Sequence, residues 1–362
     1  MRKLILFGLV VLALTACNTT PTAVPVPTLP PQPPAQTPMG VQPTVPGAPS
    51  SPVPAGPTAT KFAVAVEPSA TPVPPPPTVV AATKASAPTG RIAYSIATGD
   101  APKFHTIWVA NVNGSNAREI LTHAYWPALS PDGTRIAYYG RPEGRSEGLY
   151  LANSDGGNQK QDPIVIGAGV CCMDWSRDGN WIVYAVSGRP NQPGGPLWKL
   201  KMDGFYQTRI ELGVAGNGPA FSPDGKQIAY SGSLPGSTQL GLMLVSADGG
   251  APRQITTDNG GNAQWSPRGD KLVYQARDGA GMQIFTVNSD GSGKKQMTRG
   301  SSNDAQPVFS RDGGTIFWRS DQNGKAWAIF AMNADGTNAR KLIDNTPPDP
   351  NFWGWESLSV SP

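Results

Sequence analysis

Short apolar segments alternate with polar turns from Gly90 to Pro362. Each polar turn is followed by a short run rich in β-branched and aromatic residues, a composition that favours strands. These predicted strands are Arg135–Tyr139, Trp181–Val186, Gln227–Ser231, Lys271–Gln275 and Thr315–Arg319. A variable loop leads from each of them to a further predicted strand: Leu149–Ala152, Leu197–Met202, Leu242–Ser246, Gln283–Asn288 and Ala328–Asn333. The pattern predicts an all-β domain.

The turn before each of the first-named strands repeats the letters Ser-Pro-Asp-Gly. Its serines lie 46, 46, 44 and 44 residues apart, at Ser130, Ser176, Ser222, Ser266 and Ser310. Serine, proline and glycine at the first, second and fourth positions suit a type I turn. Arginine replaces proline at 177 and 311 and aspartate at 268, and these residues still fit the turn. A repeat of this length is typical of propeller blades with four strands.

The remaining strands of each unit follow from turn chemistry and polarity. A large apolar residue precedes every repeat serine, as Trp175 and Trp265 do, so a first strand runs into the turn and we expect these tryptophans to pack between blades. Each third strand ends in a turn built on glycine, mostly Asp-Gly, which is a strong hairpin signal. The segments after it, such as Arg253–Thr256 and Arg340–Ile343, are more polar, as expected of outermost strands.

The two ends of this region together supply a sixth unit. Arg91–Ser95, Thr106–Asn116 and Ala117–Thr122 match second, third and fourth strands, but no first strand precedes them in the pattern. Ser357–Pro362 matches a first strand and stops at Ser-Pro. We therefore predict that the C-terminal strand completes the first blade and closes a ring of six. The alternative is that Val79–Ala85 supplies that strand.

The whole repeat, PxxSPDGxxIAY followed by IYxxNxDGxNxxxLT, resembles that of TolB-type six-bladed β-propellers. The resemblance covers Gly90–Pro362 and concerns the propeller only, not TolB as a whole. It implies a fold of six four-stranded antiparallel blades around a central channel. It also implies that the repeated turn is architecture.

The first residues have the pattern of an export signal. Basic Arg2 and Lys3 precede the apolar run Leu4–Leu14, which is too short to span a bilayer. Leu14-Thr15-Ala16-Cys17 resembles the lipobox of bacterial lipoproteins. This implies a signal peptide over residues 1–16, cleavage before Cys17 and lipidation of its thiol. The alternative is an ordinary signal peptide with an incidental cysteine.

Residues 17–89 form a proline-rich segment. Of the chain's 39 prolines, 21 lie between Asn18 and Thr89, where Lys61, Glu67 and Lys84 are the charged residues. Such a composition buries too little apolar surface to offset the entropy of ordering. We expect a disordered tether between a lipid anchor and the domain 90–362.

Charge and cysteine content exclude some classes of partner. The formal charge of +4 falls to +1 within 90–362, where 25 basic face 24 acidic residues. A near-neutral domain gives no electrostatic reason to predict a nucleic-acid partner. Cys171 and Cys172 are adjacent, so they either form a vicinal disulfide or, as we favour, are two small semi-buried side chains.

Candidate catalytic motifs are weak. Ser146 lies in a G-x-S-x-G match at 144–148, but the nucleophile elbow needs a helix after the serine, and here a strand is predicted. His105, expected in a loop, and His123, after a fourth strand, are the only histidines. We predict no metal site and no cofactor, since two histidines without Cys-x-x-Cys make a zinc site improbable.

The best candidate site is the mouth of the channel where loops lead into the first strands. Aromatic rings supply contact area and polar groups fix orientation, so the combination suits a sugar or a peptide. The predicted ligand-binding residues are Tyr125, Trp126, Asn217, Asn262, Asn303, Asp304, Trp353, Trp355 and Glu356, with Cys171 and Cys172 beside them. The alternative for Trp353 and Trp355 is that they only plug the closing blade.

These observations predict a non-catalytic protein- or glycan-binding or scaffold module of the cell envelope. It would be exported and held by a lipid anchor on the periplasmic or cell-surface side of a membrane. The alternative is an envelope hydrolase, or an accessory to one, with its site at the channel mouth. A cluster of His123 with a serine and an acid would favour that alternative.

Overall fold

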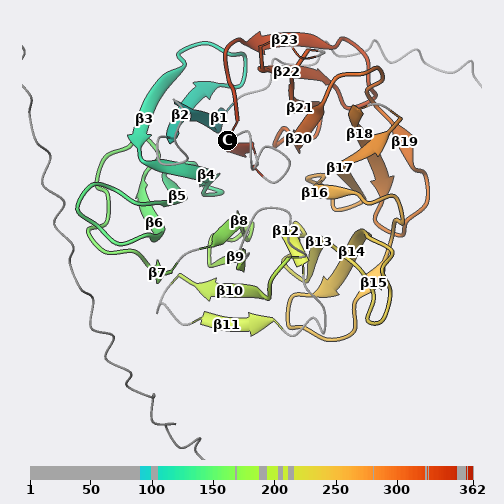
Figure 1. The fold of residues 1–362 in the computed structure, drawn as a ribbon, viewed down its shortest axis with the longest axis horizontal. Helices are drawn as coiled ribbons and strands as arrows, with labels where there is room; N and C mark the ends of the chain where they lie inside the picture. Colours follow the sequence, from blue (N-terminus) through green and yellow to red (C-terminus); the bar gives the residue numbers. More distant parts are fainter. Residues whose placement is uncertain are drawn as a thin grey trace, which may run out of the picture. The chain divides into compact units, whose positions relative to one another are not determined.

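The computed structural model describes residues 90–98, 105–167, 169–186, 194–202, 207–210, 216–279, 281–322, 324, 326–348, 356 and 358–361. Every regular element in these ranges is a strand, and the strands form six four-stranded antiparallel sheets. Figure 1 shows the sheets as blades around a centre, with β4, β8, β12, β16 and β20 innermost. The predicted six-bladed propeller is confirmed.

The strands of each blade are given from the inside outward. Blade 1 consists of β24 (Ser359–Ser361), β1 (Arg91–Ala97), β2 (His105–Asn111) and β3 (Arg118–Thr122). Blade 2 consists of β4 (Ala124–Leu129), β5 (Arg135–Gly140), β6 (Gly148–Asn153) and β7 (Val165–Ile166). Blade 3 consists of β8 (Val170–Trp175), β9 (Trp181–Val186), β10 (Leu197–Lys201) and β11 (Gln207–Ile210).

The second half of the ring has the same order. Blade 4 consists of β12 (Gly216–Phe221), β13 (Gln227–Gly232), β14 (Gly241–Ser246) and β15 (Arg253–Gln254). Blade 5 consists of β16 (Gly261–Trp265), β17 (Lys271–Asp278), β18 (Gly281–Asn288) and β19 (Lys295–Gln296). Blade 6 consists of β20 (Asp304–Phe309), β21 (Thr315–Ser320), β22 (Ala328–Asn333) and β23 (Arg340–Ile343).

The C-terminal strand closes the ring. β24 pairs with β1 in the register Arg91 with Ser361 through Ala93 with Ser359, so the alternative in which Val79–Ala85 fills this place is wrong. The neighbouring blade is tied in as well, because the backbone N–H of Leu129 donates to Ser359 Oγ at 2.8 Å. Each inner strand contacts the next, from β4 round to β24 and back to β4. The edge that an open ring would expose is thereby covered.

The repeated turn has one geometry in five blades. In blade 2 the N–H of Gly133 donates to the carbonyl of Ser130 at 2.9 Å, which closes the expected type I turn. The Ser130 hydroxyl donates to Asp132 Oδ1 and accepts the N–H of Arg135 at 2.9 Å. The glycine has a φ of 69°, a conformation that side chains disfavour. In blade 5, where Arg268 replaces the aspartate, Ser266 donates instead to Asp270, at 2.6 Å, so the bond survives the substitution.

The core lies between neighbouring blades. Second strands bury a large ring at one repeated position: Tyr94, Tyr138, Tyr184, Tyr230, Tyr274 and Trp318. Tryptophans before the repeat serine link inner strands, since Trp175 Nε1 donates to the carbonyl of Ala128 at 2.9 Å and Trp265 Nε1 to that of Ala220 at 3.2 Å. The predicted packing of these two tryptophans between blades is confirmed.

Candidate functional site: the two ends of the central channel

The six inner strands all run in the same direction along the channel, which gives the channel two different ends. At the loop end, segments from the preceding blade lead into the inner strands. At the turn end, the inner strands finish at the repeated turns. The residues predicted from the sequence belong to the loop end, and they lie mainly in the first residues of the inner strands rather than in the loops before them.

A bulge bends five inner strands near the loop end. The pairing with the second strand shifts register in each of β4, β8, β12, β16 and β20. The residue four before the repeat serine has a positive φ in every case: 54° at Trp126, 55° at Cys172, 55° at Gly218, 48° at Asn262 and 56° at Gln306. A bulge leaves one residue outside the ladder and re-aims its neighbours. Because the bulge recurs, it belongs to the architecture of the blade.

An aromatic cluster occupies one side of the loop end. The ring of Tyr125 lies 5.0 Å from Trp126, 5.0 Å from Tyr139 and 5.1 Å from His105, between centroids. Trp126 is buried and stacks on Tyr139, while Tyr125 is partly accessible and donates to Glu147 Oε1 at 3.4 Å. His105 is the first residue of β2, so its expected place in a loop is wrong. Cys171 and Cys172 in β8 are buried rather than semi-buried.

A buried ion pair lies at the other side of this end. Glu356 and Arg319 are 1% and 0% exposed, and Glu356 Oε2 lies 3.4 Å from a terminal nitrogen of Arg319. Arg319 also donates to the carbonyls of Thr346 and Ser95, while Asn262 Nδ2 donates to the Glu356 carbonyl at 2.7 Å. Burial lowers the pKa of Arg319, and the charge of Glu356 opposes that shift. These polar groups join blades 1, 5 and 6 to one another.

Two further predicted residues lie at the start of β20. Asn303 donates from its backbone N–H and from Nδ2 to the carboxylate of Asp321, at 2.9 and 2.8 Å. Asp304 is buried, and burial raises the pKa of its carboxyl. Asn217 is likewise buried, in β12. Trp353 and Trp355 lie outside the described residues. Tyr125 and Asn303 are thus the described members of the predicted set that remain partly accessible.

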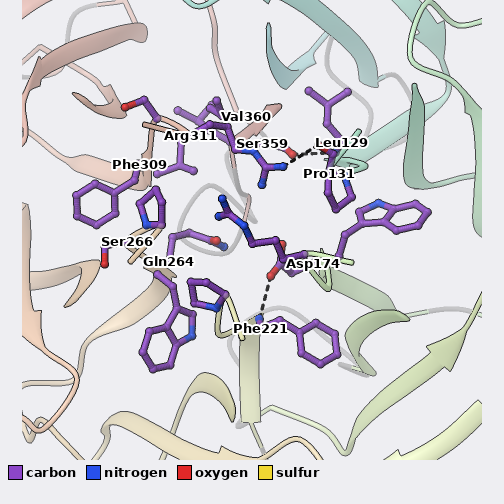
Figure 2. Close-up of a pocket in the computed structure, with 18 of the residues that line it drawn as sticks. Leu129, Pro131, Asp174, Phe221, Gln264, Ser266, Phe309, Arg311, Ser359 and Val360 are labelled. Carbon is purple, nitrogen blue, oxygen red and sulfur yellow. Dashed lines mark hydrogen bonds between the residues drawn. The ribbon is translucent and has the colours of Figure 1, made fainter. Parts of the chain in front are cut away.

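The turn end holds a cavity that sequence reasoning missed. It measures about 110 Å³ and is lined by residues from all six inner strands and their turns, among them Asp174, Arg177, Gln264, Arg311 and Ser359. Figure 2 shows Asp174 and Arg311 here, with dashed lines for the hydrogen bonds to Phe221 and Pro131. The available signal was arginine at 177 and 311, where other turns have proline.

Positively and negatively charged side chains line this cavity together. A terminal nitrogen of Arg311 donates to the Pro131 carbonyl at 2.6 Å, and Asp174 Oδ2 accepts the N–H of Phe221 at 2.9 Å. Burial raises the pKa of Asp174 to about 7, although that hydrogen bond and Arg311 oppose the shift. Burial also lowers the pKa of Arg311, and the positive charge of Arg177 lowers it further. The two guanidinium groups are therefore close enough to repel.

The structure describes the surroundings of the two motif residues considered for catalysis. Ser146 lies between β5 and β6, so a strand and not a helix follows it, and its carbonyl accepts the hydroxyl of Tyr150. His123 lies between β3 and β4 with a φ of 53°, and its carbonyl accepts the N–H of Arg141 at 3.0 Å. Within the described ranges, no three His, Cys, Asp or Glu side chains are placed to hold a metal, and no helix has the length and apolarity needed to cross a bilayer.

Comparison with protein-family models agrees with this architecture. Residues 82–283 match the model described as the TolB beta propeller domain. The chain belongs to this family. TolB from Acinetobacter baumannii has a similar structure, with a TM-score of 0.62 and 18% identity over 75% of this chain and 67% of that one. The β-propeller domain of the trilobed protease from Pyrococcus furiosus is similar too, with a TM-score of 0.52 and 14% identity over 72% of this chain and 97% of that one. These structures share the fold.

Two curated proteins match part of this chain in sequence. An uncharacterized protein of Agrobacterium fabrum is 25% identical over 181 residues, which are 49% of this chain and 59% of that protein. Dipeptidyl-peptidase 5 of Porphyromonas endodontalis is 28% identical over 135 residues, which are 35% of this chain but 20% of that enzyme. The match therefore spans less than two thirds of either relative.

Proposed function

We propose that this TolB-type propeller is a lipid-anchored binding or scaffold module of the bacterial cell envelope, exported and non-catalytic. A protein or glycan partner binds at the loop end, on Tyr125, Asn303 and the predicted residues Trp353 and Trp355. The observation that carries the proposal is the difference between the two ends: the turns repeat, but the loop end presents a different set of side chains in each blade, of which Tyr125 and Asn303 remain partly accessible. Non-repeating aromatic and amide groups on a repeating scaffold suit recognition of one partner.

The partner site is tested by capture from envelope extract of the source bacterium. Replacing Trp353 and Trp355 together by alanine removes two rings that match nothing in the other repeats. We expect the captured partner to be lost while the melting temperature stays near that of the wild type. Ile166→Ala is the matched control, because it removes an apolar side chain that is 77% exposed on an outer strand. Melting that falls, with capture proportional to the folded fraction, would show that the tryptophans only plug the blade.

A second arm separates protein from glycan. Purified peptidoglycan fragments compete with the captured partner if the site binds sugar, and leave capture unchanged if the partner is a protein. Capture that survives in the double alanine variant at full stability would contradict the loop end as the site in both cases.

The anchor is tested by Cys17→Ser. Two or three acyl chains hold a protein firmly on a membrane, whereas one holds it marginally. We expect the variant in the soluble fraction, or retained as an uncleaved precursor. A correctly cleaved variant that stays in the membrane fraction would disprove the lipid anchor.

The alternative function is an envelope hydrolase or its accessory, with a site at the channel mouth. It draws support from the relationship to Dipeptidyl-peptidase 5, although that match covers a fifth of the enzyme. A fluorophosphonate probe for activated serines distinguishes the two functions. Labelling that disappears in Ser146→Ala or in His123→Ala would favour the hydrolase, and the binding module predicts none.

A further inference from the structure

The turn end of the channel contains two arginines at a position that other blades give to proline. The residue after the repeat serine is Pro131, Pro223, Pro267 and Pro362 in four blades, but Arg177 and Arg311 in blades 3 and 6. Proline presets the backbone of this turn, so either arginine gives up that advantage. The repeated architecture therefore does not explain why two cations lie at the rim of the same cavity.

Proline has a packing role here that Arg177 does not reproduce. A Cβ atom added to Gly179, Gly269 or Gly313 would lie 4.0, 3.5 or 3.3 Å from the proline Cδ of the preceding blade. A Cβ added to Gly225, in the blade after Arg177, would meet no atom within 4 Å. A groove of about 520 Å³ lies at this junction and is lined by Arg177, Gly225, Lys199 and Lys226 as well as by Asp178, Asp224 and Asp248. The loss of a proline thus leaves an opening beside Arg177.

The charge inside the cavity is not balanced by the protein's own groups at neutral pH. Asp174 is the acid that lines it, and a pKa of about 7 leaves this carboxyl only partly ionised there. Both guanidinium groups stay charged. The turn aspartates Asp132, Asp178, Asp224, Asp270 and Asp312 are ionised, but each accepts the serine hydroxyl of its own turn and lies exposed at the rim. None of these five aspartates lines the cavity, so they weaken the long-range attraction of an anion without occupying its site.

We propose that the turn end of the channel binds one small oxyanion group, a carboxylate or a phosphate, between Arg177 and Arg311. Guanidinium forks match the geometry of both groups and bond them more strongly than neutral donors do. Gln264 in the same lining adds an amide, and Leu129, Leu358 and Val360 add apolar contacts. The site lies at the opposite end of the channel from the proposed partner site and does not depend on it.

The size of the cavity limits the ligand. Pockets that enclose a drug-sized molecule measure roughly 300–1,000 Å³. A cavity of about 110 Å³ is smaller than these and suits a small group such as one oxyanion. A larger ligand would place its anionic end here and its remainder in the groove beside Arg177.

The experiment uses the folded protein and titration calorimetry with inorganic phosphate, acetate, triglycine and amidated triglycine at constant ionic strength. We expect phosphate or a carboxylate to bind with a dissociation constant of about 1 mM or tighter. Phosphate alone binding indicates a phosphate site, and triglycine binding without its amide indicates a carboxylate site. Absence of heat and of any melting shift with all four probes would overturn the proposal.

The variants restore the residue that the other blades use. Arg177→Pro and Arg311→Pro should each weaken binding about tenfold or more, since a hydrogen bond to a charged group contributes about 1.5–3 kcal/mol. Arg268→Ala is the control, because it removes a cation from the same face outside the cavity, and it should leave binding within about twofold. If Arg311→Pro fails to fold, Arg311→Gln takes its place. Proline variants that bind as well as the wild type would overturn the proposal.

Discussion

The two ends of the channel use the same strands in opposite ways. At the turn end, one hydrogen-bonded turn recurs in five blades with nearly the same distances, so a departure such as Arg311 stands out. At the loop end every blade differs, and several of the polar groups described there bind one another across blades, as Arg319 does with Ser95 and Asn262 with Glu356. Variation alone therefore does not mark a binding site. It points to a partner site only where the varying side chain stays accessible, as those of Tyr125 and Asn303 do.

Both ends of the channel depend on a closed ring, so opening the ring should cause the largest loss of stability. Deleting residues 357–362 removes β24, its pairing with β1 and the buried Leu358. Losing one large buried side chain already costs about 2–5 kcal/mol, so we expect the free energy of unfolding to fall by about 5 kcal/mol or more, with aggregation. Urea unfolding measures this change in the free energy of unfolding. Ser359→Ala is the control, since it keeps the strand and loses one bond to Leu129; an unchanged stability in the deletion would mean that β1 has another partner.

Mutating the buried ion pair of Arg319 and Glu356 at the loop end should cause the second-largest loss of stability. Removing one partner of a buried ion pair leaves an uncompensated charge and costs about 3–5 kcal/mol. We expect this loss for Glu356→Gln, and a larger one for Arg319→Met because the carbonyls of Thr346 and Ser95 also lose a donor.

A double-mutant cycle tests whether the pair acts as a unit. Arg319→Met with Glu356→Leu should lose less than the two single losses combined, since no buried charge is left. The exposed pair of Lys341 on β23 and Asp344 just after that strand provides the contrast, and Asp344→Asn should cost under about 1 kcal/mol. Equal losses for the exposed and the buried pair would contradict the structural role assigned to Glu356.

At the turn end, Asp174 should make stability depend on pH. Its pKa is raised in the folded state, from 3.8 to about 7, so between these values the folded protein holds a proton that the unfolded chain releases. Stability from this group is therefore highest at low pH and decreases as the pH rises from about 4 to about 7. The difference in the free energy of unfolding between wild type and Asp174→Asn isolates the effect, and we expect that difference to change by about 3–4 kcal/mol over this window, since each pKa unit corresponds to about 1.4 kcal/mol. A difference that stays constant would show that the carboxyl titrates normally.

The smallest losses of stability are expected for the repeat serines, and these losses should be nearly equal from blade to blade. Replacing Ser130, Ser222 or Ser310 by alanine removes the same two hydrogen bonds in each blade, and each variant should lose about 1 kcal/mol. Asn217→Ala and Asn262→Ala at the loop end should differ from each other, because Asn262 alone is shown binding Glu356. Thermal unfolding of the five variants provides the comparison. Widely different losses of stability among the three serine variants would contradict the distinction between a uniform turn end and a varied loop end.

The sequence alone determined the blade and the number of blades. The alternation of apolar and polar residues, the chemistry of Ser-Pro-Asp-Gly and the spacing of about 45 residues are local properties, and local rules assign strands and turns. The spare strand at Ser357–Pro362 was visible in the same way, by comparison with the other units. The predicted lipid anchor and tether also rest on local patterns and lie outside the described residues.

Only the tertiary structure decided which side chains are engaged. Arg319 meets the carbonyl of Ser95 across 224 residues, and Arg311 meets that of Pro131 across 180, because the ring brings distant strands together. No periodicity encodes such a contact, so residues expected at an open mouth proved to be buried and bonded. The same closure brought Arg177, Arg311 and Asp174 to one cavity, because six inner strands end there in the same orientation.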